Sequence, residues 1–340
     1  MSFELNKEQV KARFLDPADN FREKIFSLEV RHDPLTGWAS LIYSGMGYPP
    51  MNKPYMEELR KGSDTCPFCP GNIEKATPRF PEDIISGGNI RVNEAVVLPN
   101  IRPYSQYSGV VLLSKSHFIG LDEFTPGLVT DAFTAAQSFA RQVVKHDPKA
   151  CNLSIGWNYM APAGATLSHP HIQVNLGIYP VPAQKSVGDP SEKYYREHGT
   201  NFWEELIDKE KKLDERYVGT IGSTCFLVSF APLSRLFDLL AVFPGKSCFL
   251  DLDNADLRDL STGLIRAFKD LREHGFYSFN LAVRSAPDCS EHFFCHARII
   301  SRFTFLSPGT CDRSFMEVLD NQMFSRISPE EVCRSLKKYF

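Results

Sequence analysis

The stretch Ser168-His169-Pro170-His171-Ile172-Gln173-Val174 alternates polar and apolar side chains. In an extended strand, successive side chains point to opposite faces, so His169, His171 and Gln173 share one face and the apolar residues share the other. Three polar groups on one face are costly to bury unless they hydrogen-bond or act in binding or catalysis. The segment therefore predicts a strand with one core face and one functional face. Structurally satisfied histidines are the alternative.

Upstream of this segment the chain follows the order strand, turn, strand, helix, strand. Thr125 is a candidate N-cap, and Pro126 occupies the first helical position, which suits its fixed backbone angle. The expected elements are strands at 94–99 and 110–113, a helix from Pro126 to Val144, and a strand at 152–157.

The same order of signals returns in the second half of the chain. Strands are expected at 224–230, 237–243 and 280–284, with a helix that begins near Asp253 or Asn254. The pattern predicts an internal duplication, with coincidence between two ordinary strand-helix-strand modules as the alternative. The alignment places His296 opposite His169, Arg298 opposite His171, and Ile300 opposite Gln173. The chemistry is therefore expected in the first copy.

These signals predict an α+β fold of two tandem modules, each with an antiparallel sheet flanked by helices. The second module is expected to be degenerate, because it lacks the histidine and glutamine pattern. The predicted divisions are a catalytic module with a metal knuckle at 1–190, a solvated helical connector at 191–215, and a second module at 216–340.

The composition excludes several classes of protein. The chain has 340 residues, of which 43% are hydrophobic and 23% charged, so it can bury a large core and is not generally disordered. Its net charge of -3 disfavours a dedicated nucleic-acid binder. No apolar run approaches the roughly 18 residues of a membrane span, and the N-terminal segment lacks the apolar centre of a signal peptide. Nine cysteines with no sign of export favour thiols or metal ligands, so a cytoplasmic protein is expected.

The segment Cys66-Pro-Phe-Cys69 has a spacing that allows both thiolates to bind one tetrahedral zinc ion. Two further ligands would be needed. A thioredoxin-like redox pair and unligated cysteines are the alternatives, but Pro67, Pro70 and Gly71 disfavour the helix that a redox pair would begin.

The histidine segment points to attack on a phosphate. A neutral imidazole is a competent nucleophile toward phosphorus when a hydrogen bond to its second nitrogen fixes the tautomer. Attack on an α-phosphate would produce a nucleotidyl-histidine that a second phosphate can discharge. Gln173 would donate its amide to a non-bridging oxygen without delivering a proton.

The pattern resembles the histidine-triad superfamily, and within it the transferase branch typified by galactose-1-phosphate uridylyltransferase. Glutamine at the position of Gln173 is typical of that branch, whereas the hydrolases carry a third histidine there. The motifs that carry the resemblance are 31–38, Cys66–Asn72, Arg91–Asn93, Asn158, His169-Pro-His-Ile-Gln173, Glu291–His296 and 328–331.

The resemblance implies roles for individual residues. His171 would be the nucleophile and Gln173 would bind the transferred phosphate. Asn158 and Ser168 match positions that contact phosphates, Asn93 a position near the nucleotide, and Glu317 a sugar-hydroxyl ligand. The zinc ligands would be Cys66, Cys69, His117 and His169.

The resemblance also bears on metals and assembly. Zinc with four protein ligands would brace the strand that carries His171 rather than act as a Lewis acid. The family's second metal site retains only His296 here, because Arg284 and Arg298 occupy two of the other positions, so no second metal is expected. A homodimer is implied.

Three functions remain open at this point. The first is nucleotidyl exchange between a nucleotide-sugar, by default a UDP-hexose, and a sugar phosphate. The second is an ADP-sugar phosphorylase or adenylyltransferase that discharges the nucleotide onto inorganic phosphate or sulfate. Hydrolysis is disfavoured by Gln173, because water attack benefits from a third imidazole as acid. The third is a nucleotide-binding sensor without activity. No nucleic acid or membrane partner is expected.

Overall fold

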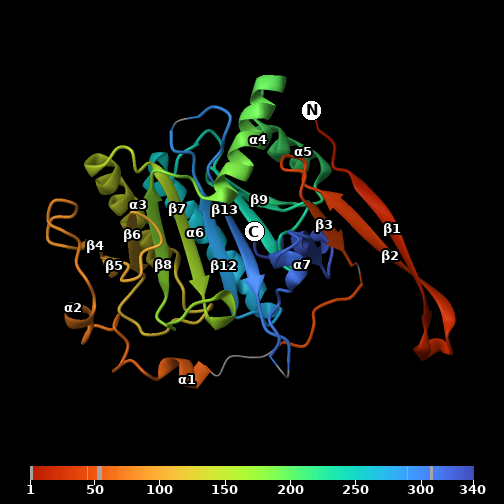
Figure 1. The fold of residues 1–340 in the computed structure, drawn as a ribbon, viewed down its shortest axis with the longest axis horizontal. Coiled ribbons are helices and arrows are strands. Elements are labelled where there is room, and N and C mark those ends of the chain that lie inside the picture. The colour runs from red at the N-terminus through yellow and green to blue at the C-terminus, as the bar shows by residue number, and fades with distance from the viewer. Residues whose placement is uncertain (1–2, 44, 52–55, 289, 307–308) are drawn as a thin grey trace.

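The structure is a computed structural model that describes residues 3–43, 45–51, 56–288, 290–306 and 309–340. Its centre is a ten-stranded antiparallel sheet with helices against it (Figure 1), so the predicted α+β class is confirmed. In spatial order the strands are β4 (Ile90–Val92), β5 (Ala95–Pro99), β6 (Tyr107–Leu112), β8 (His171–Gly177), β7 (Asn152–Tyr159), β12 (Ser278–Arg284), β13 (His296–Arg302), β11 (Asp238–Val242), β10 (Thr224–Val228) and β9 (Tyr217–Ile221).

The strand order is mirrored about the junction between β7 and β12. Each strand of the first half has a counterpart at the same distance from this junction in the second half. The register has the same centre, because Gly156 pairs with Ala282 at the midpoint of the ladder. On either side of that midpoint, Asn158 pairs with Asn280 and Ser154 pairs with Arg284. Reciprocal pairing of this kind is what a two-fold relation between the halves produces.

The register corrects the sequence alignment of the two halves by two residues. His171 is the first residue of β8, and His296 is the first residue of the corresponding strand β13. His296 therefore corresponds to His171, not to His169, and Arg298 corresponds to Gln173. A shift of two residues leaves every side chain on the same face of its strand, so the alternating pattern could not detect it.

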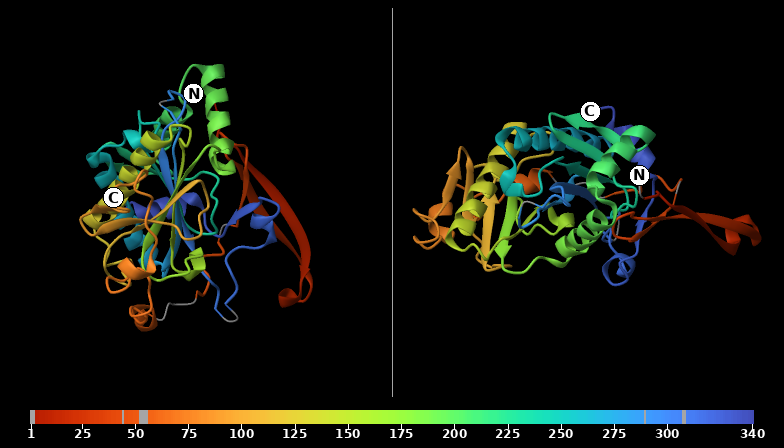
Figure 2. Two further views of the ribbon diagram at one scale, coloured as in Figure 1. Left: turned by 60° about the vertical axis from the view of Figure 1, so that its left-hand side comes forward. Right: turned by 90° about the horizontal axis from the view of Figure 1, so that it is seen from above.

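Two long helices cover one face of the sheet (Figure 2): α3 (Pro126–His146) and α6 (Asn254–Glu273). Both begin where the sequence predicted. The Thr125 hydroxyl accepts a hydrogen bond from the amide of Leu128, and Asp253 caps α6 in a capping box with Asp256.

A single apolar core lies between these helices and the sheet. It includes Val111 and Ile172 from the first half and Phe226 and Leu281 from the second half. The domain boundaries at residues 190 and 216 stay a prediction, because the sheet and its core continue across them.

The segment between the halves forms two helices, α4 (Pro182–His198) and α5 (Phe202–Leu213). Helical structure was predicted here, but the expectation of a fully solvated connector is wrong for α5. Its apolar side, including Trp203 and Leu206, is buried against Leu227 and Leu240 of strands β10 and β11. The charged residues that dominate this segment occupy the opposite side of an amphipathic helix.

A smaller sheet joins the N-terminal segment to the end of the chain. Its order is β1 (Lys7–Asp16), β2 (Arg22–His32), β3 (Ala39–Ile42) and β14 (Met323–Ser325). The β1–β2 hairpin extends away from the body of the molecule (Figures 1 and 2). Several of its apolar side chains are exposed, namely Val10, Phe14, Leu15, Phe21 and Ile25.

The remaining elements are short. They are the helices α1 (Met56–Arg60), α2 (Ile73–Ala76), α7 (Phe315–Val318) and α8 (Pro329–Leu336), and 3-10 turns at Pro17–Asp19, Ala161–Ala163 and Phe249–Asp251. Within the ranges that the structure describes, no helix combines the length and apolarity that a bilayer crossing requires.

Candidate functional site

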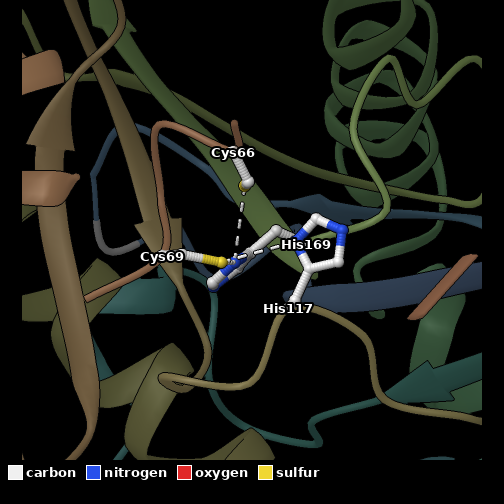
Figure 3. Close-up of side chains that lie close together, drawn as sticks. All are labelled: Cys66, Cys69, His117 and His169. Atoms are coloured by element: carbon white, nitrogen blue, oxygen red, sulfur yellow. Dashed lines mark hydrogen bonds between the residues drawn. The ribbon is translucent and has the colours of Figure 1, made fainter. Parts of the chain in front are cut away.

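Four side chains from three separate segments meet beside the N-terminal end of β8 (Figure 3). The sulfur and nitrogen atoms of Cys66, Cys69, His117 and His169 all lie within 4.8 Å of one another. The Cys69 sulfur lies 3.4 Å from His117 Nδ1 and 3.8 Å from His169 Nδ1, and the Cys66 sulfur lies 3.9 Å from His169 Nδ1. Ligand atoms around a tetrahedral zinc are separated by roughly 3.3–3.8 Å. The geometry and the donor set therefore fit zinc.

Local hydrogen bonds hold the ligands in position. The Asn72 side chain donates to the carbonyl oxygen of Cys66 at 2.9 Å, which closes the cysteine loop. His169 donates from Nε2 to the Ser114 carbonyl oxygen at 2.9 Å, so its Nδ1 is unprotonated and faces the sulfurs. Burial lowers the pKa of His169 to about 4, which keeps the ring in the neutral form that can bind a metal.

The two cysteine thiols are poorly suited to stay together without a cation. Burial and the neighbouring Cys66 raise the pKa of Cys69 to about 11. A divalent cation reverses this preference, because it binds the thiolate form directly. The cluster thus has a physical reason to be occupied.

His171 is presented by the same segment. It is the first residue of β8, its side chain is 9% exposed, and its Nδ1 lies 2.9 Å from the carbonyl oxygen of His169. A carbonyl can only accept, so Nδ1 carries the proton and Nε2 holds an unshared electron pair. The Phe68 ring lies edge-on at 5.6 Å from the His171 ring and at 5.9 Å from the His169 ring. Phe68 thus packs the cysteine loop against both histidines.

Gln173 follows on the same face of β8 and is half-buried, with Ile172 and Val174 in the core beneath it. The predicted division of this strand into a core face and a polar face is therefore confirmed for His171 and Gln173. His169 differs from the prediction because it precedes the strand.

Asn158 is oriented by a residue that the sequence analysis did not single out. Its Oδ1 accepts a hydrogen bond of 2.6 Å from Nδ2 of Asn280, on the neighbouring strand β12. The Asn280 oxygen in turn accepts from Arg302 at 2.7 Å, and Arg302 pairs with Asp312 at 2.9 Å. With its oxygen committed, Asn158 has its Nδ2 group left to donate to a ligand. No sequence motif marks this relay, because it forms across the junction of the two halves.

The other three predicted residues lie in different settings. Ser168 precedes His169 directly and is half-buried. Asn93 lies in the exposed turn between β4 and β5 and donates to Asp131 at 3.0 Å. Its φ of 51° is a turn conformation that asparagine tolerates well.

Glu317 is engaged within its own chain. Its carboxylate accepts from Arg235 at 2.7 Å and from the backbone and hydroxyl of Ser314, and its side chain is 1% exposed. Burial opposes its ionisation, but these donors outweigh burial and lower the pKa of Glu317 to about 2. Within the described ranges, no hydrogen bond connects Glu317 with the His171 strand. Its role as a sugar ligand stays a prediction.

Comparisons with known proteins agree with this fold. No protein-family model matches the chain. An uncharacterized protein of Archaeoglobus fulgidus is 27% identical over 311 residues, which cover 92% of each chain.

Among solved structures, an ADP-glucose phosphorylase from Arabidopsis thaliana with bound ADP-glucose is similar, with a TM-score of 0.72 and 19% identity over 92% of this chain and 98% of that chain. A GalT-like protein from Arabidopsis thaliana has a TM-score of 0.70 and 19% identity over 92% and 99% of the two chains. A uridylyltransferase has a TM-score of 0.68 and 20% identity over 91% and 98%. The predicted resemblance is confirmed at the level of the fold.

Proposed function

We propose that the chain is a nucleotidyltransferase that acts in two steps through a nucleotide bonded to His171. The observation that carries the proposal is the tautomer of His171, whose Nδ1–H donates to the His169 carbonyl oxygen at 2.9 Å and leaves Nε2 with an unshared pair. A neutral imidazole held in this way is the form that attacks phosphorus. The ring stands on a strand inside the sheet, so its orientation is set before a substrate binds.

The two steps need no proton transfer to His171. In the first step, Nε2 bonds to the α-phosphorus of a nucleoside diphosphate sugar, and the bond from that phosphorus to the bridging oxygen breaks. The sugar 1-phosphate leaves with the electron pair, and the ring gains a positive charge that the His169 carbonyl oxygen stabilises. In the second step, a phosphate oxygen of the acceptor attacks the phosphorus, and the electron pair of the P–N bond returns to Nε2.

Two amides would stabilise the charge on the transferred phosphate. Gln173 lies two residues beyond His171 on the same face, and Asn158 lies on the adjacent strand β7 with its oxygen held by Asn280. Each can donate an N–H to a non-bridging oxygen. Amides are suited to this role because they supply donors without exchanging a proton.

The metal cluster would position the nucleophile. Zinc bound by Cys66, Cys69, His117 and His169 has no open coordination position, so the chemistry it supplies is structural. His169 connects the two parts, since its side chain belongs to the cluster and its carbonyl oxygen orients His171. Movement of His169 would therefore misplace the Nε2 pair.

Two donor classes are supported. A UDP-hexose with a hexose 1-phosphate acceptor follows from the sequence resemblance. An ADP-sugar discharged by inorganic phosphate or sulfate is supported by the likeness to a phosphorylase with bound ADP-glucose. The sensor alternative shares the pocket but would form no covalent adduct.

Covalent labelling tests the proposal. The protein is incubated with UDP-glucose or ADP-glucose labelled at the α-phosphate, and acid-labile label on the protein is measured. We expect label with one of the two donors, none on the His171→Gly variant, and parental label on the control variant His198→Gly, whose ring is exposed on α4. Release of the label by hexose 1-phosphate identifies exchange, and release by inorganic phosphate identifies phosphorolysis. Equal labelling of His171→Gly and the parent would show that the nucleophile is assigned wrongly.

A further inference from the structure

The second half carries a counterpart of His171 in the same local geometry. His171 opens β8 opposite Leu112, and His296 opens β13 opposite Val242 of the corresponding strand β11. The Nδ1 atom of His296 lies 2.9 Å from the Phe294 carbonyl oxygen, two residues earlier, just as His171 bonds to His169. The mirrored sheet thus places two histidines with the same tautomer at opposite ends of the junction strands.

The residues around the second histidine differ in charge. Arg298 corresponds to Gln173, and Arg284 corresponds to Asn158, because each arginine lies at the mirrored place in its ladder. Two guanidinium groups cannot ligate a metal and repel a cation. A second metal of the kind found in similar transferases therefore does not fit this place.

His296 itself is packed as a structural group. It is 3% exposed, and its ring lies 4.2 Å from the Trp203 ring and 5.5 Å from the Phe293 ring. Burial, with further contributions from Arg284 and Arg298, lowers its pKa to about 3, so the ring is uncharged at neutral pH. It is not placed to attack a substrate.

The two arginines are neutralised unequally. Arg298 forms a two-pronged pair with Asp238 at 2.7 and 2.8 Å and a further bond to the Ser229 hydroxyl. Arg284 is half-buried, and within the described ranges its guanidinium has no hydrogen-bond acceptor and no carboxylate partner. A partly buried cation without a counter-ion is unfavourable, and an anion from solution would relieve the cost.

A small cavity reaches this cluster. It has a volume of about 60 Å³, and its lining includes His296, Arg298, Trp38 and Trp203. The space suits a small tetrahedral oxyanion or a few water molecules, and it is too small for a whole nucleotide in this conformation.

We propose that the second half binds a phosphate-type oxyanion, held by Arg284 next to Arg298 and His296. The ligand is either inorganic phosphate or the phosphate group of a small ester, bound without chemistry. The planar guanidinium of arginine is suited to such an oxyanion, because it can donate two parallel hydrogen bonds. The proposal does not depend on the role of His171, since the two places lie at opposite ends of β7 and β12.

Tryptophan fluorescence and thermal unfolding test the proposal in the intact protein. Two of the three tryptophans, Trp38 and Trp203, line the cavity, whereas Trp157 is buried in the core. Sodium phosphate, glucose 1-phosphate and AMP are titrated against sodium chloride at constant ionic strength. We expect saturable quenching or a spectral shift, and a rise in the unfolding temperature with inorganic phosphate. A response to the esters alone would identify a phosphomonoester as the ligand.

The variant Arg284→Gln separates this site from the catalytic one. We expect phosphate binding to weaken roughly tenfold to a hundredfold, as for the loss of charge-assisted hydrogen bonds. Because an uncompensated charge is removed, Arg284→Gln should unfold at the parental temperature or above it in phosphate-free buffer, which also shows that it folds. Arg284→Lys should retain part of the response, and the control Arg258→Gln, exposed on α6, should retain all of it. Parental phosphate binding by Arg284→Gln, or no response of the parent to any of the three probes, would overturn the proposal.

Discussion

Asn280 offers a sharp test of how the two halves cooperate at the candidate site. Its Nδ2 donates to Asn158 Oδ1 at 2.6 Å and to the Ala163 carbonyl oxygen at 2.9 Å, while its Oδ1 accepts from Arg302 at 2.7 Å. The donated bond to Asn158 decides which end of the Asn158 amide is available to a phosphate. Asn280 is thus a positioning residue, which acts through Asn158.

The substitution Asn280→Asp changes this choice while the side chain keeps its size. A carboxylate still accepts from Arg302 but cannot donate, so the Asn158 amide must rotate and donate its Nδ2 to the new carboxylate. The transferred phosphate then loses one donor, worth roughly 1.5–3 kcal/mol for a charged acceptor. Labelling by the nucleotide-sugar should slow by roughly tenfold to a hundredfold. The stability should change by about 1 kcal/mol or less, because the new ion pair with Arg302 offsets the two lost donors.

The assay is the single-turnover rate of label transfer to the protein, with the unfolding temperature measured in parallel. Asn254→Asp is the matched control, because it makes the same chemical change at an exposed position in the first turn of α6. If Asn280→Asp folds normally and is labelled at the parental rate, the orientation of the Asn158 amide does not matter for the reaction. A parent that takes no label from either donor would instead contradict the proposed function.

Three further outcomes are expected. Metal analysis should find about one zinc per chain, and Cys66→Ser should lose it together with several degrees of unfolding temperature, whereas full zinc content in that variant would contradict the assigned ligand set. Burial opposes ionisation of Glu330, but Arg31 and Arg216 outweigh burial and lower its pKa to about 2 from the usual 4.5, so its contribution, on the order of 3 kcal/mol, is complete above pH 4.5 and is lost as the pH falls toward 2. Acid unfolding followed by circular dichroism should therefore lose steepness in Glu330→Gln, and an unchanged acid transition would refute this. Finally, the exposed apolar side chains on the β1–β2 hairpin are expected to dock on a second copy, so Phe14→Ser should shift the mass measured by light scattering toward the monomer, and a parent that is monomeric at high concentration would refute the dimer.

Local physics accounts for what the sequence analysis predicted correctly. Thr125 and Asp253 are side chains that cap helices wherever an apolar helical pattern follows, and both caps formed as expected. Alternation along a strand depends only on backbone geometry, so the polar face of His171 and Gln173 could be predicted from seven residues. The pair of cysteines implied a metal by its spacing, although its two histidine partners came from the family resemblance alone.

Other features depend on contacts between distant parts of the chain. The two-residue error in aligning His296 with His169 arose because a shift by two keeps the alternation intact, and only the ladder to β11 resolves it. Likewise, the charged segment that contains α5 gave no sign that Trp203 would be buried on β10 and β11.

The sequence by itself determined the helices, the polar strand face and the identity of the nucleophile, because each follows from neighbours within a few residues. The tertiary structure decided that Asn280 orients Asn158 and that Arg284 stands without a counter-ion beside Arg298. Both depend on the antiparallel register between β7, β12 and β13. That register is selected by the fit of the shared core and not by any short stretch of sequence.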